Sequence, residues 1–301
     1  MDHINWYPGH MKKTRELIRD NLKLVDLVVE VIDARIPVSS RNPIIDELVG
    51  GKPRLIVLNK SDLSDEDANR AWTSYLKKDG VDVLSMNCMT GAGVKSLLRE
   101  LDRIEKQILR KKEEVRQASG QDVRREDNAA VRKRKPLRMM IVGVPNVGKS
   151  SLINRLTGKK SARTGDRPGV TKGKQWLTLS NGMQLLDTPG ILWPKLEDPM
   201  TGLDLAFCGS IRDEILNIAD LGLELIRRLM QDYPDLLAAR YGLEEIPEDP
   251  LACMEEIARK RGAILPGKRI DYDRVAKIVT DEFRAGKIGR ITLERPPEVQ
   301  A

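Results

Sequence analysis

The sequence predicts an α/β fold, in which a mostly parallel sheet carries helices on both faces and a small all-α domain follows it. Consecutive apolar and β-branched residues recur in short runs over the first two thirds of the chain. Such runs are typical of strands buried on both faces of a parallel sheet, and segments with a helical spacing of apolar residues separate them. Beyond about Pro199 only helical patterns recur. We therefore divide the chain into an α/β domain at residues 1–198 and a helical domain at residues 199–301.

Length and composition allow this division. The 301 residues are 40% hydrophobic and 32% charged, which suffices for two ordinary domains with normal cores. No apolar run approaches the ~20 residues that a membrane span needs, and the first residues lack the apolar stretch of a secretory signal. The three cysteines lie far apart, as is typical of free thiols in a reducing compartment. We expect a cytoplasmic protein with no membrane partner.

The first half of the α/β domain alternates strands and helices. A basic segment at about residues 117–136 follows this half, and we expect it to be a flexible linker. The expected strands are Leu27–Ile32, Leu55–Leu58 and Val81–Ser85, and the expected helices are Pro43–Val49, Asp65–Lys78 and Val94 to about Arg116.

The second half repeats the alternation. A strand at Leu137–Val142 leads through a glycine-rich loop into a helix at Ser151–Leu156. Ser180-Asn181-Gly182, between two apolar runs, is a hairpin signature. In the helical domain Ile218 to Tyr233 is amphipathic, and Asp249, directly before a proline, is a typical helix start.

The glycine-rich loop carries the strongest functional signal. Gly143–Ser150 fits the pattern G-x-x-x-x-G-K-[ST] and lies between a predicted strand and a predicted helix, the context that a phosphate-binding loop requires. Its backbone amides and the helix N-terminus attract phosphate oxygens. We expect Lys149 to reach the β- and γ-phosphates of a nucleotide and the Ser150 hydroxyl to bind Mg²⁺. The other residues expected to line the nucleotide here are Pro145, Asn146, Val147, Gly148 and Ser151.

Two further motifs, each after a predicted strand, define the nucleotide. Asp187 opens Asp-Thr-Pro-Gly, and we expect it to hold Mg²⁺ while the amide of Gly190 contacts the γ-phosphate. Asp62 ends Asn-Lys-Ser-Asp, and its carboxylate can accept two hydrogen bonds, from the N1–H and the exocyclic amine of guanine. Adenine does not offer this pair. Asn59 and Lys60 are expected to brace the loop and the base, so the sequence predicts a site for GTP.

Two weaker elements complete the set. Ser85, Met86 and Asn87 stand at the end of the third strand and fit a loop whose backbone contacts guanine O6; an ordinary strand end is the alternative. Thr171 lies in the glycine-rich, basic stretch Arg167–Gly173, where a mobile switch is expected. We predict that Thr171 completes the Mg²⁺ shell, with a plain surface loop as the alternative.

The order of these motifs is unusual. The segment Asn59–Asp62, which we name the guanine loop, precedes the phosphate loop at Gly143–Ser150. In ordinary GTPases the phosphate loop comes first. Because domain termini often lie close together and permutation is tolerated, the two halves can rebuild one sheet. The chain resembles the circularly permuted GTPases, and specifically the ribosome biogenesis GTPase A (YlqF/RbgA) family. The resemblance rests on the permuted motifs, on the helical domain, and on Trp6–Met11, Asp33–Pro37 and Arg167–Thr171.

The resemblance covers essentially the whole chain. It implies a circularly permuted P-loop GTPase domain at residues 1–198, followed by an α-helical domain at residues 199–301 that binds RNA or the ribosome. It also implies a factor for late assembly of the large ribosomal subunit, which contacts rRNA and ribosomal proteins. Such a factor hydrolyses GTP slowly until the particle stimulates it, and leaves after hydrolysis. We expect a monomer.

The catalytic group is less evident. Many GTPases orient the attacking water with a Gln soon after Asp-x-x-Gly, but Ile191–Trp193 follow Gly190 here. The sequence therefore predicts slow intrinsic hydrolysis. His10 is the candidate substitute, to which the resemblance also points, and an anchoring histidine is the alternative. By resemblance to potassium-dependent GTPases, Asn146 is a candidate K⁺ ligand.

The basic charge is local. Residues 103–138 hold 13 Lys and Arg against 6 Asp and Glu, and the whole chain has a net charge of +7. This excess favours a polyanionic partner such as RNA, although a solvated helix and linker is equally compatible. Alternative functions are a nucleotide-switched RNA-binding module and a GTPase that acts on another RNA such as tRNA. The candidate RNA contacts are Lys12, Lys13, Arg15, Arg132, Lys133, Arg134, Lys135, Lys268 and Arg269.

Overall fold

The computed structural model describes most of the chain. Among its described parts no helix is long and apolar enough to cross a membrane. The described residues are 16, 18–77, 81–118, 136–158, 175–187, 198–211, 213 and 217–297.

A six-stranded sheet forms the centre of the α/β domain, in the order β3-β2-β1-β4-β6-β5. Neighbouring strands are parallel except for β5 and β6, which form the expected antiparallel hairpin. β1 and β4 pair directly, so the two halves of the permuted chain meet in the middle of one sheet. The strands are β1 (Leu27–Asp33), β2 (Arg54–Asn59), β3 (Asp82–Met86), β4 (Arg138–Val142), β5 (Gln175–Thr178) and β6 (Gln184–Asp187).

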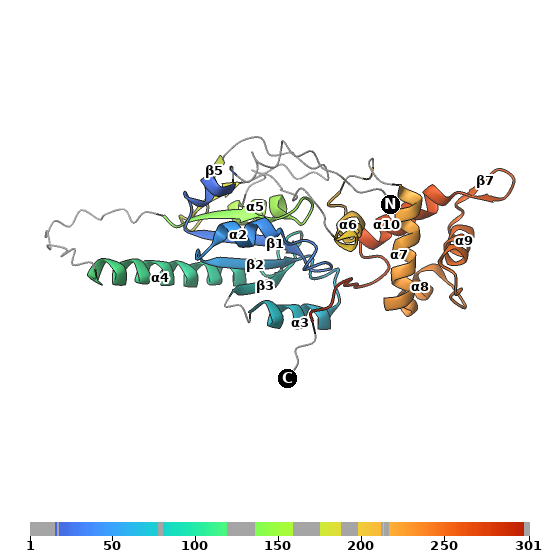
Figure 1. Ribbon diagram of the computed structural model, residues 1–301, viewed down its shortest axis with the longest axis horizontal. Coiled ribbons are helices and arrows are strands. Elements are labelled where there is room, and N and C mark those ends of the chain that lie inside the picture. Colours follow the sequence, from blue (N-terminus) through green and yellow to red (C-terminus); the bar gives the residue numbers. More distant parts are fainter. Residues whose placement is uncertain are drawn as a thin grey trace.

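Helices cover both faces of this sheet because its side chains alternate between them. Val29 and Val31 of β1 belong to the same apolar cluster as α4 (Val94–Ala118) and α5 (Lys149–Thr157). On the other face, Val28 packs with α2 (Pro43–Val49). Ile32 packs there with α3 (Glu66–Lys77). The α4 helix projects beyond the sheet at the end opposite the helical domain (Figure 1).

The helical domain holds five helices among the described residues. As the sequence predicts, Asp249 caps the start of α9 by accepting from the Ala252 amide. Gly262 ends this helix in the left-handed conformation. A short hairpin, β7 (Ile264–Leu265) with β8 (Arg269–Ile270), departs from the all-α expectation. The helices are α6 (Pro199–Phe207), α7 (Ile218–Asp232), α8 (Pro234–Tyr241), α9 (Pro250–Arg261) and α10 (Tyr272–Arg284).

Residues 286–297, which we name the C-terminal strap, run back from the helical domain onto the α/β domain. The Ile291 amide donates to the Leu63 carbonyl at 2.9 Å, and the Leu293 amide donates to the Arg35 carbonyl at 2.8 Å. The indole of Trp72, in α3, donates to the strap at the Glu294 carbonyl. The strap is the dark red end of the chain, which reaches α3 (Figure 1).

The strands and helices expected between Leu27 and Leu186 are confirmed, with ends that differ by one or two residues. The expected linker at residues 117–136 overlaps the end of α4, which continues to Ala118. Residues 119–135 lie outside the described part of the chain. The short helices α6 and α8 were not expected, because nine and eight residues are too few for an apolar stripe to repeat.

Candidate functional site

The functional motifs meet at one edge of the sheet. Gly143–Ser150 follows β4, Asn59–Asp62 begins at the end of β2, and Asp187 ends β6. These strands are parallel, so their carboxyl ends lie at the same edge. The chain order reverses between β1 and β4, and in open α/β sheets this switch point is where ligands bind.

The phosphate loop has the geometry its glycines predict. Gly148 has a φ of +101°, and a Cβ there would come within 2.1 Å of Asn59 Nδ2. A Cβ on Gly143 would come within 2.3 Å of a carbonyl oxygen in β1. The Nζ of Lys149 donates to the Val144 carbonyl at 2.7 Å inside the loop, and Lys149 is only 8% exposed. The loop therefore leads tightly into the N-terminus of α5, where backbone amides can bind phosphate.

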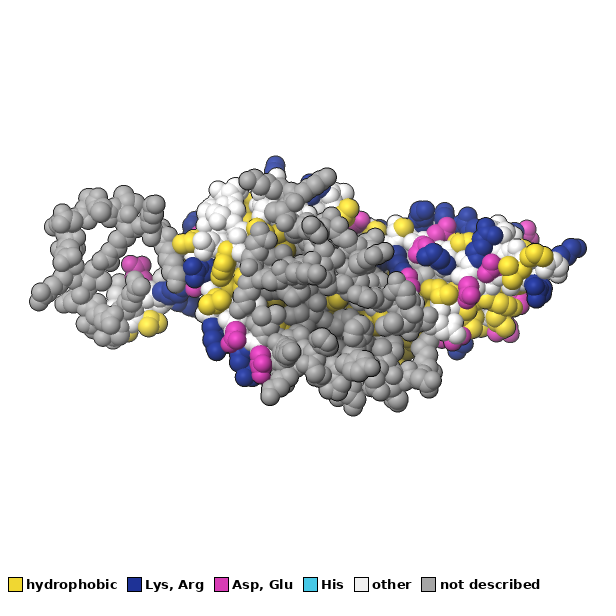
Figure 2. Space-filling view, turned by 90° about the horizontal axis from the view of Figure 1, so that it is seen from above, with side chains coloured by type: hydrophobic (Ala, Val, Ile, Leu, Met, Phe, Trp, Pro, Cys, Tyr) yellow, Lys and Arg dark blue, Asp and Glu magenta, His cyan; other side chains and the backbone are white. Residues whose placement is uncertain are grey.

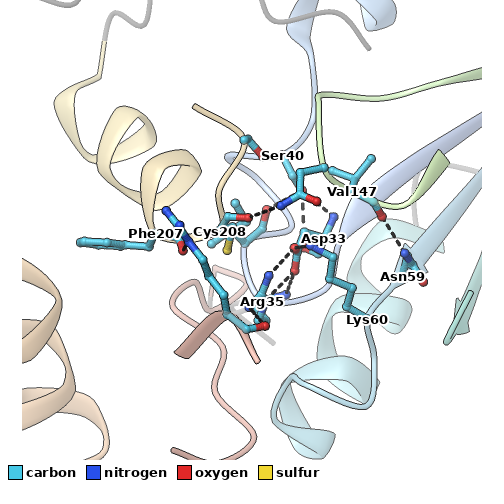
Figure 3. Close-up of polar contacts among 12 residues, drawn as sticks. Asp33, Arg35, Ser40, Asn59, Lys60, Val147, Phe207 and Cys208 are labelled. Carbon is cyan, nitrogen blue, oxygen red and sulfur yellow. Dashed lines mark hydrogen bonds and ion pairs between the residues drawn. The ribbon is translucent and has the colours of Figure 1, made fainter. Parts of the chain in front are cut away.

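Asn59 joins three loops of the site. Its Nδ2 donates to the Val147 carbonyl of the phosphate loop at 2.6 Å, and its Oδ1 accepts from the Cys88 amide at 2.9 Å. The side chain is 3% exposed, so both bonds are protected from water. Figure 3 shows the bond that links Asn59 to Val147. These loops lie up to 88 positions apart in the sequence, and the amide of Asn59 brings them together.

The α5 helix, which follows the phosphate loop, also contacts the loop after β3. Arg155 of α5 donates to the carbonyls of Cys88, at 3.2 Å, and of Met89. Ser151 lies 3.6 Å from the Met89 sulfur. Two of the three residues expected in this loop, Ser85 and Met86, belong to β3 itself.

Lys60 is oriented by a buried ion-pair network that sequence analysis did not identify. Its Nζ lies 2.8 Å from Asp33 Oδ2, and Arg35 binds both oxygens of the same carboxylate, at 3.0 and 2.8 Å (Figure 3). Burial alone would raise the pKa of Asp33, but the charges of Arg35 and Lys60 hold it well below its usual value. Arg35 also donates to the carbonyls of Phe283 and Arg284 at the end of α10.

Asp62, the expected guanine reader, is exposed at the rim of this edge. The Ser61 amide before it donates to the Met86 carbonyl at 3.3 Å, and the Leu63 amide after it donates to the Lys60 carbonyl at 2.9 Å. The carboxylate thus stands on a loop whose backbone is fixed, while the side chain faces solvent.

The helical domain contacts the phosphate loop directly. Asn146, at a φ of +61°, donates through Nδ2 to the Cys208 carbonyl at 3.1 Å. The buried Ser210 hydroxyl donates to the Pro145 carbonyl at 2.9 Å. No local pattern marks Cys208–Ser210 as part of a nucleotide site, because these contacts form only when the two domains pack.

Other expected site residues lie outside the described part of the chain: His10, Thr171 and Gly190. Of Asp187 only the backbone is described, at the end of β6. Ser150 is the second residue of α5, which follows β4. Asp187 ends β6, the strand that pairs with β4, so both positions lie at the same edge of the sheet. Of the candidate RNA contacts only Lys268 and Arg269 are described, and both are exposed on the β7–β8 hairpin.

Fold and site together define a class. A parallel sheet with a phosphate loop entering α5, and a guanine-type loop tied to it through Asn59, is the arrangement of a P-loop GTPase whose motifs are circularly permuted along the chain. The pairing of β1 with β4 shows that the permuted halves rebuild one sheet.

Comparisons with known proteins agree with this class. A family model described as "50S ribosome-binding GTPase" matches residues 138–246. Ribosome biogenesis GTPase A of Priestia megaterium is 45% identical over 297 residues, which cover 99% of this chain and 98% of that protein. Mitochondrial ribosome-associated GTPase 1 of Bos taurus is 32% identical, over 98% of this chain and 89% of that protein. GNP-bound YlqF from T. maritima matches with a TM-score of 0.61 at 30% identity, over 95% of this chain and 100% of that chain.

The GDP-bound YlqF structure matches with a TM-score of 0.66 at 30% identity, over 94% of this chain and 100% of that chain. The chain belongs to the ribosome biogenesis GTPase A family of circularly permuted GTPases. It is therefore a GTP-binding hydrolase, as the sequence predicts.

Proposed function

We propose that this GTPase acts in late assembly of the large ribosomal subunit. In the GTP state it binds rRNA and ribosomal proteins of a precursor particle, and it leaves after hydrolysis. The observation that carries the proposal is that Asn59 anchors the phosphate loop to the guanine loop, which brings together the nucleotide motifs of the two halves of the chain. The names of the relatives support the ribosomal partner.

Each loop has its own task in this proposal. Lys149 and the amides of the phosphate loop bind the β- and γ-phosphates, and Asp62 reads the guanine edge. Ser150, Asp187 and Thr171 hold Mg²⁺, which neutralises charge that develops on the phosphates. The backbone amide of Gly190 contacts the γ-phosphate.

Hydrolysis needs a group beyond these. No Gln follows Gly190, so we assign His10 to orient the attacking water. The amide nitrogen of Asn146 is used on the Cys208 carbonyl, which leaves its Oδ1 as the atom suited to bind K⁺ beside the phosphates.

The helical domain supplies the basic surface for RNA. Dark blue Lys and Arg side chains, interleaved with magenta Asp and Glu, lie along the part of this domain visible in Figure 2. Exposed basic residues of α9, the β7–β8 hairpin and α10 include Arg259, Lys260, Lys268, Arg269 and Arg274. Such a surface binds phosphates with strong salt dependence, and it suits an RNA duplex read by shape.

The test is GTP turnover with and without purified large-subunit precursors, in K⁺ and in Na⁺. We expect particles to stimulate turnover. We expect His10→Ala to lower the stimulated rate about 100-fold with unchanged GTP affinity, as loss of a proton-transferring or water-orienting group does. A GTP turnover rate that does not change when particles are added would favour an RNA-binding module that uses nucleotide as a switch. An unchanged rate in His10→Ala would remove His10 from catalysis, and equal rates in Na⁺ and K⁺ would remove the cation site at Asn146.

A further inference from the structure

The guanine loop is held from outside the α/β domain. We propose that Arg290, in the C-terminal strap, is a positioning residue for guanine recognition, which fixes the backbone on either side of Asp62. This inference rests on the proposed role of Asp62 as the guanine reader.

The Arg290 guanidinium contacts the guanine loop and the residues just after it. Its Nε donates to the Ser64 carbonyl at 2.8 Å, and its Nη2 donates to the Ser61 carbonyl at 3.0 Å. Its Nη1 lies 3.2 Å from the Glu66 carboxylate, in the first turn of α3. A planar guanidinium can satisfy acceptors in this fixed fork, which an ammonium cannot do.

The strap adds backbone contacts around the same loop. The Ile291 amide donates to the Leu63 carbonyl at 2.9 Å, and the Asp65 amide donates to the Thr292 hydroxyl at 3.0 Å. Strap residues therefore bind the carbonyls of both residues that flank Asp62. The Asp62 side chain is exposed, so its position depends on this backbone rather than on packing of its own.

The other side of the strap is anchored in the helical domain. The Tyr233 hydroxyl, at the end of α7, accepts from the Thr292 amide at 3.0 Å and donates to the Thr292 carbonyl at 2.9 Å. Ile291 and Leu293 are buried, at 1% and 3% exposed. The strap thus joins the helical domain to the base-reading loop by a route that does not involve the γ-phosphate switch. By linkage, a partner that shifts the strap must change guanine affinity, and guanine must change the partner's affinity equally.

The test compares GDP with inosine diphosphate, which keeps N1–H but lacks the exocyclic amine. Dissociation constants are measured for the wild-type chain, Asp62→Ala, Arg290→Ala, Arg290→Lys and Arg295→Ala. Arg295 is the matched control, because it lies on the same strap and pairs with Asp65 at 3.3 Å but donates to no carbonyl of the loop among the contacts described. Thermal unfolding of each variant reports folding.

If Arg290 positions Asp62, Arg290→Ala weakens GDP about tenfold and inosine diphosphate about threefold, because only GDP uses both oxygens of the carboxylate. Arg290→Lys lowers the same preference for GDP, and Arg295→Ala keeps it at the wild-type value. Should Arg290→Ala fail to fold, Arg290→Lys decides.

An equal loss for both nucleotides, or a wild-type preference in the Arg290 variants, overturns the positioning role while Asp62 keeps its own. If the wild-type chain shows no preference for GDP, or if Asp62→Ala keeps that preference, Asp62 does not recognise guanine. The proposed role of Arg290 then fails as well.

Discussion

At the scale of single residues, the site depends on positions where no other side chain fits. Gly148 and Asn59 pack directly against each other, because the glycine has no side chain in the space where the Asn59 amide lies. Asn59 in turn links the phosphate loop to the loop after β3. A methyl group at residue 148 therefore disturbs both loops at once.

We predict that Gly148→Ala destabilises the protein and weakens GDP binding at least tenfold. Gly182→Ala is the matched control, because Gly182 also has a positive φ, of +86°, and no atom lies within 4 Å of an added Cβ. The control carries only the conformational cost, about 1 kcal/mol, whereas Gly148→Ala adds a clash with Asn59. Urea unfolding and GDP titration measure both effects. Similar losses in the two variants would show that the close approach to Asn59 has no consequence.

At the scale of elements, two carboxyl groups meet where α6, the strap and the loop after β1 join. Asp204 in α6 is 3% exposed, and its Oδ2 lies 3.4 Å from the Ser39 hydroxyl. Glu294 in the strap accepts from the Ser39 amide at 2.9 Å. Burial, together with the charge of Glu294, raises the pKa of Asp204 to about 7, although the charge of Arg228 opposes the shift. Burial also raises the pKa of Glu294.

This pair makes the domain junction sensitive to pH. A carboxyl group with a raised pKa in the folded state contributes stability that is fully present below its unfolded value, 3.8, and is lost as the pH rises through about 7. Asp204→Asn keeps a donor toward Glu294 and does not ionise. We expect its free energy of unfolding to exceed that of the wild type by about 1–3 kcal/mol near pH 8, with no such gain near pH 4.

Urea unfolding between pH 4 and pH 8 measures the difference. Asp273→Asn, at an exposed position on α10, is the control and should follow the wild-type pH dependence. An Asp204→Asn curve parallel to that of the wild type would contradict the account of this junction.

The same scale shows what sequence could and could not predict. β1 and β2 were predictable because each is a short run of mostly apolar residues. The α4 helix was predictable because its apolar residues repeat at helical spacing, and Lys149 because its motif encodes the chemistry locally. Ser210 and Arg290 were not, since neither belongs to a local motif. Arg290 meets Ser61 across 229 positions, and Ser210 meets Pro145 across 65. The Asp33 carboxylate was visible in Asp33–Pro37, but its pairing with Lys60 depends on β1 and β2 lying side by side.

At the scale of the whole molecule, the helical domain holds the nucleotide site at two places. Cys208 and Ser210 bind the phosphate loop, and the strap binds the guanine loop. The domain that presents the β7–β8 hairpin is thus connected to both the phosphate loop and the guanine loop. Under the proposed function, this connection lets nucleotide state change the affinity for a particle, because the nucleotide site and the particle-binding surface would both depend on the packing between the two domains.

Co-sedimentation with purified large-subunit precursors tests this account most directly. The wild-type chain is loaded with GDP or with a non-hydrolysable GTP analogue and centrifuged with the particles at fixed salt, since contacts to RNA phosphates weaken as salt rises. The account predicts that the protein pellets with the particles in the analogue and stays largely in the supernatant with GDP. Equal recovery in the two nucleotide states, or no recovery in either, would contradict it.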